Sequence, residues 1–318
     1  MNKKPYPSLV FFGTPEFARY CLDYLVTAGF PIKAVVTAPD RKAGRGKKLT
    51  PSVVKHYALA QKLTVLQPTH LKNDLFIEQL SALEAELFVV VAFRMLPKAV
   101  WSLPALGTIN LHASVLPNYR GAAPINWVLI NGEKETGVST FLIDEAIDSG
   151  LLLQTRTLPI DKKDNFGTLH DKLLHLGAPL LEETLLGRKD QRLIPQKQDE
   201  SKFVNAAPKL NTENTRIIWS HSLEQIVNQI RGLNPYPGAW TILTNEGQDY
   251  RIKIYEAEAL HEEVTHEIGQ LVIRAGQLLI STAEGYLLCK EVQFPNKKRM
   301  RVKDLLNGFK LGTEAVIH

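Results

Sequence analysis

An asparagine, a histidine and an aspartate carry the clearest chemical signal in this sequence. Asn110 and His112 lie two residues apart in an apolar run, so on an extended strand both side chains point to the same face. Asp148 follows downstream, in an Asp-Ser-Gly segment. An amide polarises a carbonyl and an imidazole moves a proton near neutral pH, which together suit acyl transfer to an amine. For an isolated Asn-x-His pair, a polar strand end and a buried structural histidine would be the commoner explanation.

Short apolar runs predict the strands that position this pair. We expect buried strands at 9–12, 32–37, 87–92 and 109–112, and helices between them, for example at 71–83 and 124–130. Strands that alternate with helices form a parallel sheet covered on both faces, so we predict an α/β, Rossmann-like domain. Ligands bind such sheets beyond the carboxyl ends of the strands, where Asn110 and His112 are expected to lie.

The turn after the first strand argues against a dinucleotide site. It runs Gly13-Thr-Pro15-Glu16-Phe17 and lacks the Gly-x-Gly-x-x-Gly pattern. Pro15 and Glu16 stand where a pyrophosphate would need bare backbone and no negative charge. We therefore expect a Rossmann-like sheet without a nicotinamide site.

The rest of the chain predicts a second, smaller domain. Strand-like runs at 138–142 and 151–157 would extend the first sheet in an antiparallel sense, with Asp148 in the loop between them, and a helix is expected at 168–186. Ser222 and Gln225 form a capping-box pattern at the start of a helix. Alternating runs at 239–243, 250–255, 270–273, 277–281 and 285–292 predict a small antiparallel β domain. We place the domains at 1–188 and 209–318, with a polar linker at 189–208.

Composition sets the broad class. The chain has 318 residues with 44% hydrophobic and 22% charged residues, as in ordinary globular proteins. It has no apolar run near the ~20 residues that span a bilayer and no secretory signal pattern, so we expect a cytoplasmic protein. Cys21 and Cys289 lie far apart without metal-ligand spacing, and we expect both in the core and no metal site.

Two clusters of positive charge indicate a polyanionic partner. The net charge is +5. Each cluster alone would usually be a solvated surface, but two clusters in two domains suit a folded RNA. The first, in a glycine-spaced loop after the second predicted strand, is Arg41, Lys42, Arg45, Lys47 and Lys48, and the second is Lys297, Lys298, Arg299, Arg301 and Lys303.

Several segments, taken in order, resemble one family. Asn110-Leu-His112-Ala-Ser114-Val-Leu-Pro117 with the downstream Asp-Ser-Gly is similar to the signature of folate-dependent formyltransferases. Segments 12–18, 39–48, 120–127 and 234–239 resemble further motifs of that family, so the similarity covers nearly the whole chain. The resemblance implies a Rossmann-like formyltransferase domain followed by a small C-terminal β-barrel domain of OB type that binds tRNA. It also implies 10-formyltetrahydrofolate as the formyl donor and the α-amine of methionyl-initiator tRNA as the acceptor, giving N-formylmethionyl-tRNA for translation initiation.

The resemblance assigns roles to the candidate catalytic residues. Asn110 would donate a hydrogen bond to the developing oxyanion. His112 would accept the amine proton or bind the oxyanion once protonated, and Asp148 would orient or charge the imidazole or relay a proton. The sequence leaves the division of proton steps between His112 and Asp148 open. Asp144 is a rival carboxylate, but the Asp-Ser-Gly context and the turn that Gly150 permits favour Asp148.

The resemblance also implies the binding surfaces. The folate would contact Ser114, Val115, Leu116, Pro117, Phe93, Arg94 and Leu96. Arg94 stands where the family often has glycine, and it could either pair with the folate glutamate tail or be exposed. The tRNA acceptor end would meet the first basic loop, with Arg41 ranked first and Lys42, Arg45, Lys47 and Lys48 beside it, and Lys298 and Arg299 would bind tRNA from the second domain.

Two other functions compete with this one. A sibling enzyme would formylate a small amine, such as a nucleotide-sugar or glycinamide ribonucleotide, or hydrolyse formyl-folate. A non-catalytic RNA-binding protein could use the same two domains. The basic loop and the C-terminal β domain favour tRNA over a small amine, and the presence of Asn110, His112 and Asp148 favours an enzyme. We expect a monomer.

Overall fold

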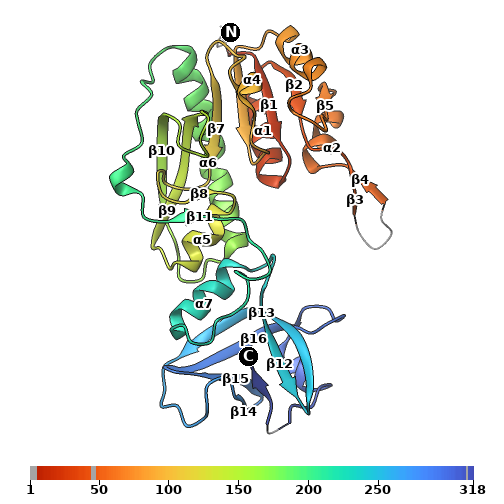
Figure 1. Ribbon diagram of the computed structural model, residues 1–318, viewed down its shortest axis with the longest axis vertical. Helices are drawn as coiled ribbons and strands as arrows, with labels where there is room; N and C mark the ends of the chain where they lie inside the picture. Colours follow the sequence, from red (N-terminus) through yellow and green to blue (C-terminus); the bar gives the residue numbers. More distant parts are fainter. Residues whose placement is uncertain (1–5, 44–47, 313) are drawn as a thin grey trace. The chain divides into compact units, whose positions relative to one another are not determined.

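The computed structural model describes residues 6–43, 48–312 and 314–318 (Figure 1). The chain divides into two compact units, and each is described by itself. The first unit comprises residues 1–121, 135–158 and 170–206, and the second comprises residues 122–134, 159–169 and 207–318. In this division residues 189–206, predicted as linker, group with the first unit, and residues 122–134 and 159–169, predicted in the first domain, group with the second.

A mixed sheet forms the centre of the first unit. Its strand order is β10-β9-β7-β6-β1-β2-β5. The strands are β1 (Leu9–Gly13), β2 (Ile32–Val36), β5 (Val65–Leu66), β6 (Leu87–Val91), β7 (Thr108–His112), β9 (Glu135–Leu142) and β10 (Leu152–Pro159). The strands from β5 to β7 pair in parallel, and β9 runs antiparallel to β7. The predicted parallel sheet with an antiparallel extension is therefore confirmed.

Helices cover both faces of this sheet (Figure 1). They are α1 (Glu16–Ala28), α2 (Val53–Ala60), α3 (Asp74–Ala82), α4 (Lys98–Trp101) and α6 (Phe166–Lys189). On one face, Phe12 and Val90 pack in a buried cluster with Phe76 of α3 and Val100 of α4. On the other face, α6 lies so close that a Cβ at Gly177 would come within 3.0 Å of Leu111. None of the helices in the described part of the chain is long and apolar enough to cross a membrane.

Capping residues determine where several helices begin and end, which the apolar periodicity of the sequence predicts only approximately. The helix expected at 71–83 begins only at Asp74, because the Asn73 side chain accepts a hydrogen bond from the Phe76 N–H at 3.1 Å. Gly29 ends α1 with a φ of 92°, a left-handed conformation that favours glycine. The predicted capping box is confirmed, since Ser222 and Gln225 each accept a bond from the other's backbone N–H.

The basic segment after β2 is a β-hairpin at its base. Strands β3 (Arg41–Ala43) and β4 (Lys48–Thr50) pair through Arg41 with Thr50 and Lys42 with Leu49, and the tip falls outside the described residues. The preceding Asp40 accepts bonds from Lys55 at 2.7 Å and Gln67 at 2.8 Å, and these donors hold the pKa of its carboxyl below the ordinary value. The base of the hairpin is thus tied to α2 and to the segment after β5.

The second unit is built on a curled antiparallel sheet and a helix. The sheet order is β14-β15-β16-β13-β12-β18, and β17 pairs with β16. The long strand β13 shifts register between Ile254 and Ala257, where bulges let it curl. Its elements are α5 (Pro124–Ile130), α7 (Leu223–Gly232), β12 (Ala239–Asn245), β13 (Gln248–Leu260), β14 (Leu271–Arg274), β15 (Gln277–Thr282), β16 (Gly285–Gln293), β17 (Met300–Arg301), α8 (Val302–Leu306) and β18 (Val316–Ile317).

One apolar core unites this second unit. Ile226 and Ile230 of α7 are buried with Ile254 of β13 and Leu287 of β16. The amphipathic pattern of the helix and the alternation of the strands both point their apolar faces into this core. The small antiparallel β domain predicted from the sequence is therefore confirmed.

Candidate active site

The candidate site is built on the last residues of β7. Because Val90 pairs with Asn110 in the parallel register, Asn110 and His112 lie on the sheet face opposite Leu111 and α6. Asn110 is half-buried, and its side chain has no hydrogen-bond partner among the described residues. His112 is 7% exposed, so its ring is almost fully enclosed. The amide is thus available as a donor beside an imidazole with limited access to water.

The imidazole is fixed by a backbone carbonyl that sequence reasoning missed. His112 Nε2 lies 2.8 Å from the carbonyl oxygen of Tyr119, whose φ of 61° is unusual for a residue other than glycine. A carbonyl oxygen only accepts, so Nε2 carries the hydrogen of this bond. In the neutral ring Nδ1 then keeps a free lone pair. Nδ1 lies 3.8 Å from Asp148 Oδ2.

Asp148 faces the histidine but is held by the backbone. Its Oδ2 accepts a hydrogen bond from the Gly121 N–H at 2.8 Å, whereas the 3.8 Å to His112 Nδ1 is longer than a hydrogen bond. Its φ is 53°, again in the left-handed region. Tyr119 rather than Asp148 therefore fixes the orientation of the ring. The carboxylate is close enough to stabilise positive charge on it.

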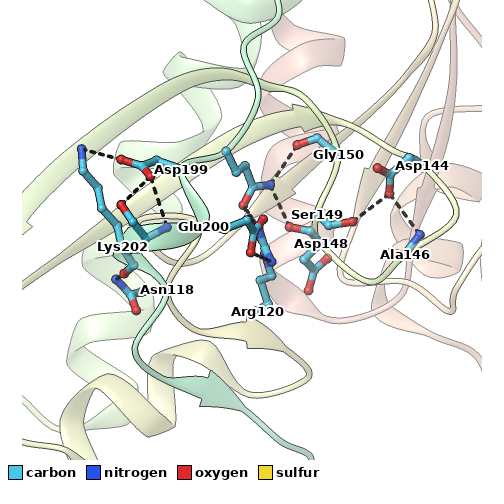
Figure 2. Close-up of polar contacts among 12 residues, drawn as sticks. Asn118, Arg120, Asp144, Ala146, Asp148, Ser149, Gly150, Asp199, Glu200 and Lys202 are labelled. Atoms are coloured by element: carbon cyan, nitrogen blue, oxygen red, sulfur yellow. Dashed lines mark hydrogen bonds and ion pairs between the residues drawn. The ribbon is translucent and has the colours of Figure 1, made fainter.

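The rival carboxylate Asp144 caps the same loop. Its Oδ1 accepts bonds from the Ala146 N–H and the Ser149 hydroxyl, both at 3.1 Å (Figure 2). The loop brings Asp148, and not Asp144, to His112. Asp144 therefore has the turn-stabilising role that is common for aspartate in loops.

The residues expected to contact folate lie at two neighbouring strand ends. After β7, Ser139 of β9 donates to the Ser114 carbonyl at 2.8 Å and accepts from the Leu116 N–H at 3.1 Å. Val115 is half-buried, while Ser114, Leu116 and Pro117 are buried. After β6, Leu96 is buried, and the ring of Phe93 packs edge-on to Phe12 at 5.7 Å.

Arg94 is half-buried rather than exposed. Its guanidinium donates to the carbonyls of Pro68 at 2.8 Å and Thr69 at 3.2 Å, and its carbon lies 5.3 Å from the ring centre of Phe93. Nε is buried and has no hydrogen-bond partner within the part of the chain that the structure describes. Burial lowers the pKa of this guanidinium below the ordinary value, and the charge of Arg41 lowers it further. The pairing of Arg94 with a folate tail stays a prediction.

The predicted tRNA contacts are of different kinds. Arg41 and Lys42 are exposed on β3, and Lys48 begins β4. Arg45 and Lys47 lie outside the described residues. In the second unit Lys298 is exposed.

Arg299, the other predicted contact there, is already engaged within its own unit. It donates to Asn234 at 2.9 Å, pairs with Glu291 and lies 4.5 Å from the ring centre of Tyr255. The positive charge of Arg299 is thus partly neutralised by Glu291 within the second unit.

Metal ligands and thiols are the other groups in the chain that could carry chemistry. The described residues contain no group of three or more His, Cys, Asp or Glu side chains that could hold a metal. Both cysteines are buried, and burial raises the pKa of each thiol, in the case of Cys289 to about 12. Neither thiol is therefore poised as a nucleophile.

Comparison with known proteins identifies the family. A family model described as Formyl transferase matches residues 8–185, and one described as Formyl transferase, C-terminal domain, matches residues 209–310. A methionyl-tRNA formyltransferase of Flavobacterium johnsoniae is 47% identical over 310 residues and 98% of each chain. One of Parabacteroides distasonis is 44% identical over 317 residues and 97% of each chain.

A solved structure shares the fold. The N-formyltransferase from Helicobacter canadensis, in complex with folinic acid and dTDP-3-aminofucose, has a TM-score of 0.65 at 21% identity, and the alignment covers 90% of this chain and 99% of that one. The Formyl transferase match includes β7 and the loop that carries Asp148. The protein is thus an enzyme that transfers one-carbon groups, and the chain belongs to the formyltransferase family.

Proposed function

We propose that the protein transfers the formyl group of 10-formyltetrahydrofolate to the α-amine of methionyl-initiator tRNA. The observation that carries the proposal is the arrangement at the end of β7, where Asn110, whose amide has no partner among the described residues, shares a strand face with the enclosed imidazole of His112, and Asp148 faces that imidazole. The name of the Flavobacterium johnsoniae relative, which aligns with 98% of this chain, supports methionyl-tRNA as the acceptor. The reaction belongs to translation initiation, in the cytoplasm, and the protein acts as a monomer.

Asn110 stabilises the oxyanion in this proposal. The amine attacks the formyl carbon, and the carbonyl oxygen gains negative charge in the tetrahedral intermediate. The half-buried Asn110 amide has no competing partner among the described residues, so its N–H is free to bind that oxygen. A donor that is already in place loses little energy to reorganisation when the charge develops.

His112 Nδ1 accepts the proton that the attacking amine loses. Nε2 is committed to the Tyr119 carbonyl, which leaves Nδ1 as the basic nitrogen of the neutral ring. The resulting imidazolium is stabilised by Asp148, 3.8 Å away, and by the Tyr119 carbonyl on the other side. The proton then passes from His112 or Asp148 to the folate nitrogen as the carbon–nitrogen bond of the donor breaks.

The folate binds between the ends of β6 and β7. Val115 and Phe93 are half-buried and offer apolar side-chain surface to the ligand. The buried residues mainly shape the walls of the binding site, and they are Ser114, Leu116, Pro117 and Leu96. Arg94 uses two of its five N–H groups on the carbonyls of Pro68 and Thr69, and in this proposal a remaining N–H group binds the glutamate tail.

The tRNA is bound by both domains. Arg41 and Lys42, exposed at the base of the hairpin, contact phosphates of the acceptor end, and Arg45, Lys47 and Lys48 belong to the same proposed set of tRNA contacts. Lys298 contributes from the 209–318 domain, and Arg299 contributes less because Glu291 already neutralises part of its charge. Recognition through such contacts is mainly electrostatic and therefore sensitive to salt.

An acceptor panel tests this function. Formyl transfer from 10-formyltetrahydrofolate is measured with methionyl-initiator tRNA, methionyl-elongator tRNA, amino sugars and water as acceptors. We expect product only with the initiator tRNA. Transfer to an amino sugar, or hydrolysis of the folate without a tRNA product, would refute the assigned acceptor and keep the chemistry of the site. Tight tRNA binding with no turnover of any acceptor would refute the enzyme.

A further inference from the structure

Residues 196–205, here called the strap, lie against the candidate site within the first unit. Gln196 exchanges two backbone hydrogen bonds with Leu152 of β10, at 2.7 and 2.9 Å. Two residues later, Gln198 is 9% exposed, although its segment is rich in charged residues. A buried glutamine in a polar segment must satisfy both ends of its amide.

The Gln198 amide holds the backbone on both sides of Ser149. Its Nε2 donates to the carbonyls of Asp148 and Gly150, both at 2.9 Å. Its Oε1 accepts from the Arg120 guanidinium at 2.7 and 3.2 Å. Because a guanidinium only donates and a carbonyl only accepts, this is the one orientation of the amide that suits both neighbours.

The guanidinium of Arg120 is held by the exposed carboxylate of Glu200 as well as by Gln198. It donates to both carboxylate oxygens of Glu200, at 2.6 and 3.0 Å (Figure 2). The guanidinium holds the pKa of Glu200 below its ordinary value. The chain of contacts thus runs from Glu200 through Arg120 and Gln198 to the Asp148 turn.

The strap also holds the other neighbour of His112. The Tyr119 N–H donates to the Asn205 carbonyl at 2.7 Å. The Asn118 side chain donates to the Lys202 carbonyl at 2.7 Å and accepts from the Val204 N–H at 2.7 Å. Both residues that flank the imidazole, Tyr119 and Asp148, have left-handed backbones, and the strap is bonded to each of them. Such conformations persist where the surroundings fix them.

We propose that Gln198 is a positioning residue of the transfer reaction, which acts through Asp148. Its two bonds keep the Asp148–Gly150 turn in place and so keep the carboxylate 3.8 Å from His112 Nδ1. The inference rests on the proposed role of Asp148. It differs from a role in stability alone, in which Gln198 would only attach the strap to the sheet.

The test replaces the amide by side chains that lack its N–H donors, with or without its acceptor oxygen. Gln198→Glu keeps the size and the partner for Arg120 but has no N–H for the two carbonyls at pH 8, and Gln198→Ala loses both ends. We expect kcat for formyl transfer to fall by about 10- to 100-fold in each variant, the scale of a misplacement near 1 Å, with KM nearly unchanged. The control Glu200→Gln keeps the Gln198 bonds and is expected to change kcat less than about threefold, since the Glu200 side chain is 66% exposed and the new amide oxygen still accepts from Arg120.

A double-mutant cycle separates positioning from stability. If Gln198 acts through Asp148, then Gln198→Glu added to Asp148→Asn lowers kcat no further than Asp148→Asn alone. Additive losses, or wild-type kcat in Gln198→Glu, would overturn the proposal.

A second readout does not depend on turnover. The nitrogen chemical shifts of the His112 ring should change in Gln198→Glu and stay unchanged in Glu200→Gln. Unchanged shifts in Gln198→Glu would overturn the inference even if no acceptor were formylated. An inactive wild-type enzyme whose His112 shifts respond to Gln198→Glu would refute the proposed function alone.

Discussion

Gly150→Ala should damage the active site through a backbone clash. A Cβ at Gly150 would lie 1.8 Å from the carbonyl oxygen of Leu142 and 3.3 Å from the ring of Phe141. Cβ atoms essentially never approach a heavy atom closer than 3.0 Å, so the turn or the end of β9 must move by roughly 1.2 Å or more. Asp148 lies two residues away and would move with the turn. We expect a loss of about 1–3 kcal/mol in stability and about 10²-fold in kcat.

Steady-state kinetics and thermal unfolding measure both effects. The matched control is Gly308→Ala, because a Cβ at Gly308 meets nothing within 4 Å. The control should keep the kcat and Tm of the wild type. A Gly150→Ala enzyme with wild-type kcat would show that the position of the Asp148 turn does not matter for transfer, and the reasoning would fail.

Three further predictions follow from the geometry. Asn110→Ala should lower kcat by about 10²–10³-fold with little change in tRNA affinity, and an effect on affinity alone would contradict the oxyanion role. Arg41→Ala should weaken tRNA binding and lower the salt dependence by somewhat under about one unit, measured by titration at several salt concentrations, whereas an unchanged slope would remove Arg41 from the RNA surface. Cys21 and Cys289 should stay unreactive toward a thiol reagent at pH 8 until the protein unfolds, because both are buried and burial raises the pKa of each thiol, and labelling of the native protein would contradict this packing.

The sequence predicted the elements well where local patterns decide them. Apolar runs located β1, β6 and β7, and Ser222 with Gln225 located the start of α7. Alternation found the strands of the second unit except the short β17 and β18, which have too few residues for a period to appear. The linker predicted at 189–208 rests on polarity alone, and polarity cannot distinguish a solvated linker from a chain whose polar groups are bonded to the protein.

The site could be predicted in part. Asn110 and His112 share a face because a strand has a period of two, which the sequence contains. The partners of the imidazole cannot be derived that way. The left-handed backbones of Tyr119 and Asp148 have no sequence signature, and Gln198 comes from fifty positions further along the chain. Such contacts arise from tertiary packing, so only the structure revealed that Tyr119 orients His112.

Single-turnover formyl transfer to methionyl-initiator tRNA, with the wild type and His112→Ala measured in parallel, tests the central claim most directly. The account predicts rapid formation of N-formylmethionyl-tRNA by the wild type. His112→Ala should bind the tRNA with similar affinity and form product at least about 10²-fold more slowly, because the base that accepts the amine proton is gone. Equal rates for the two proteins would contradict the claim that this site carries the transfer.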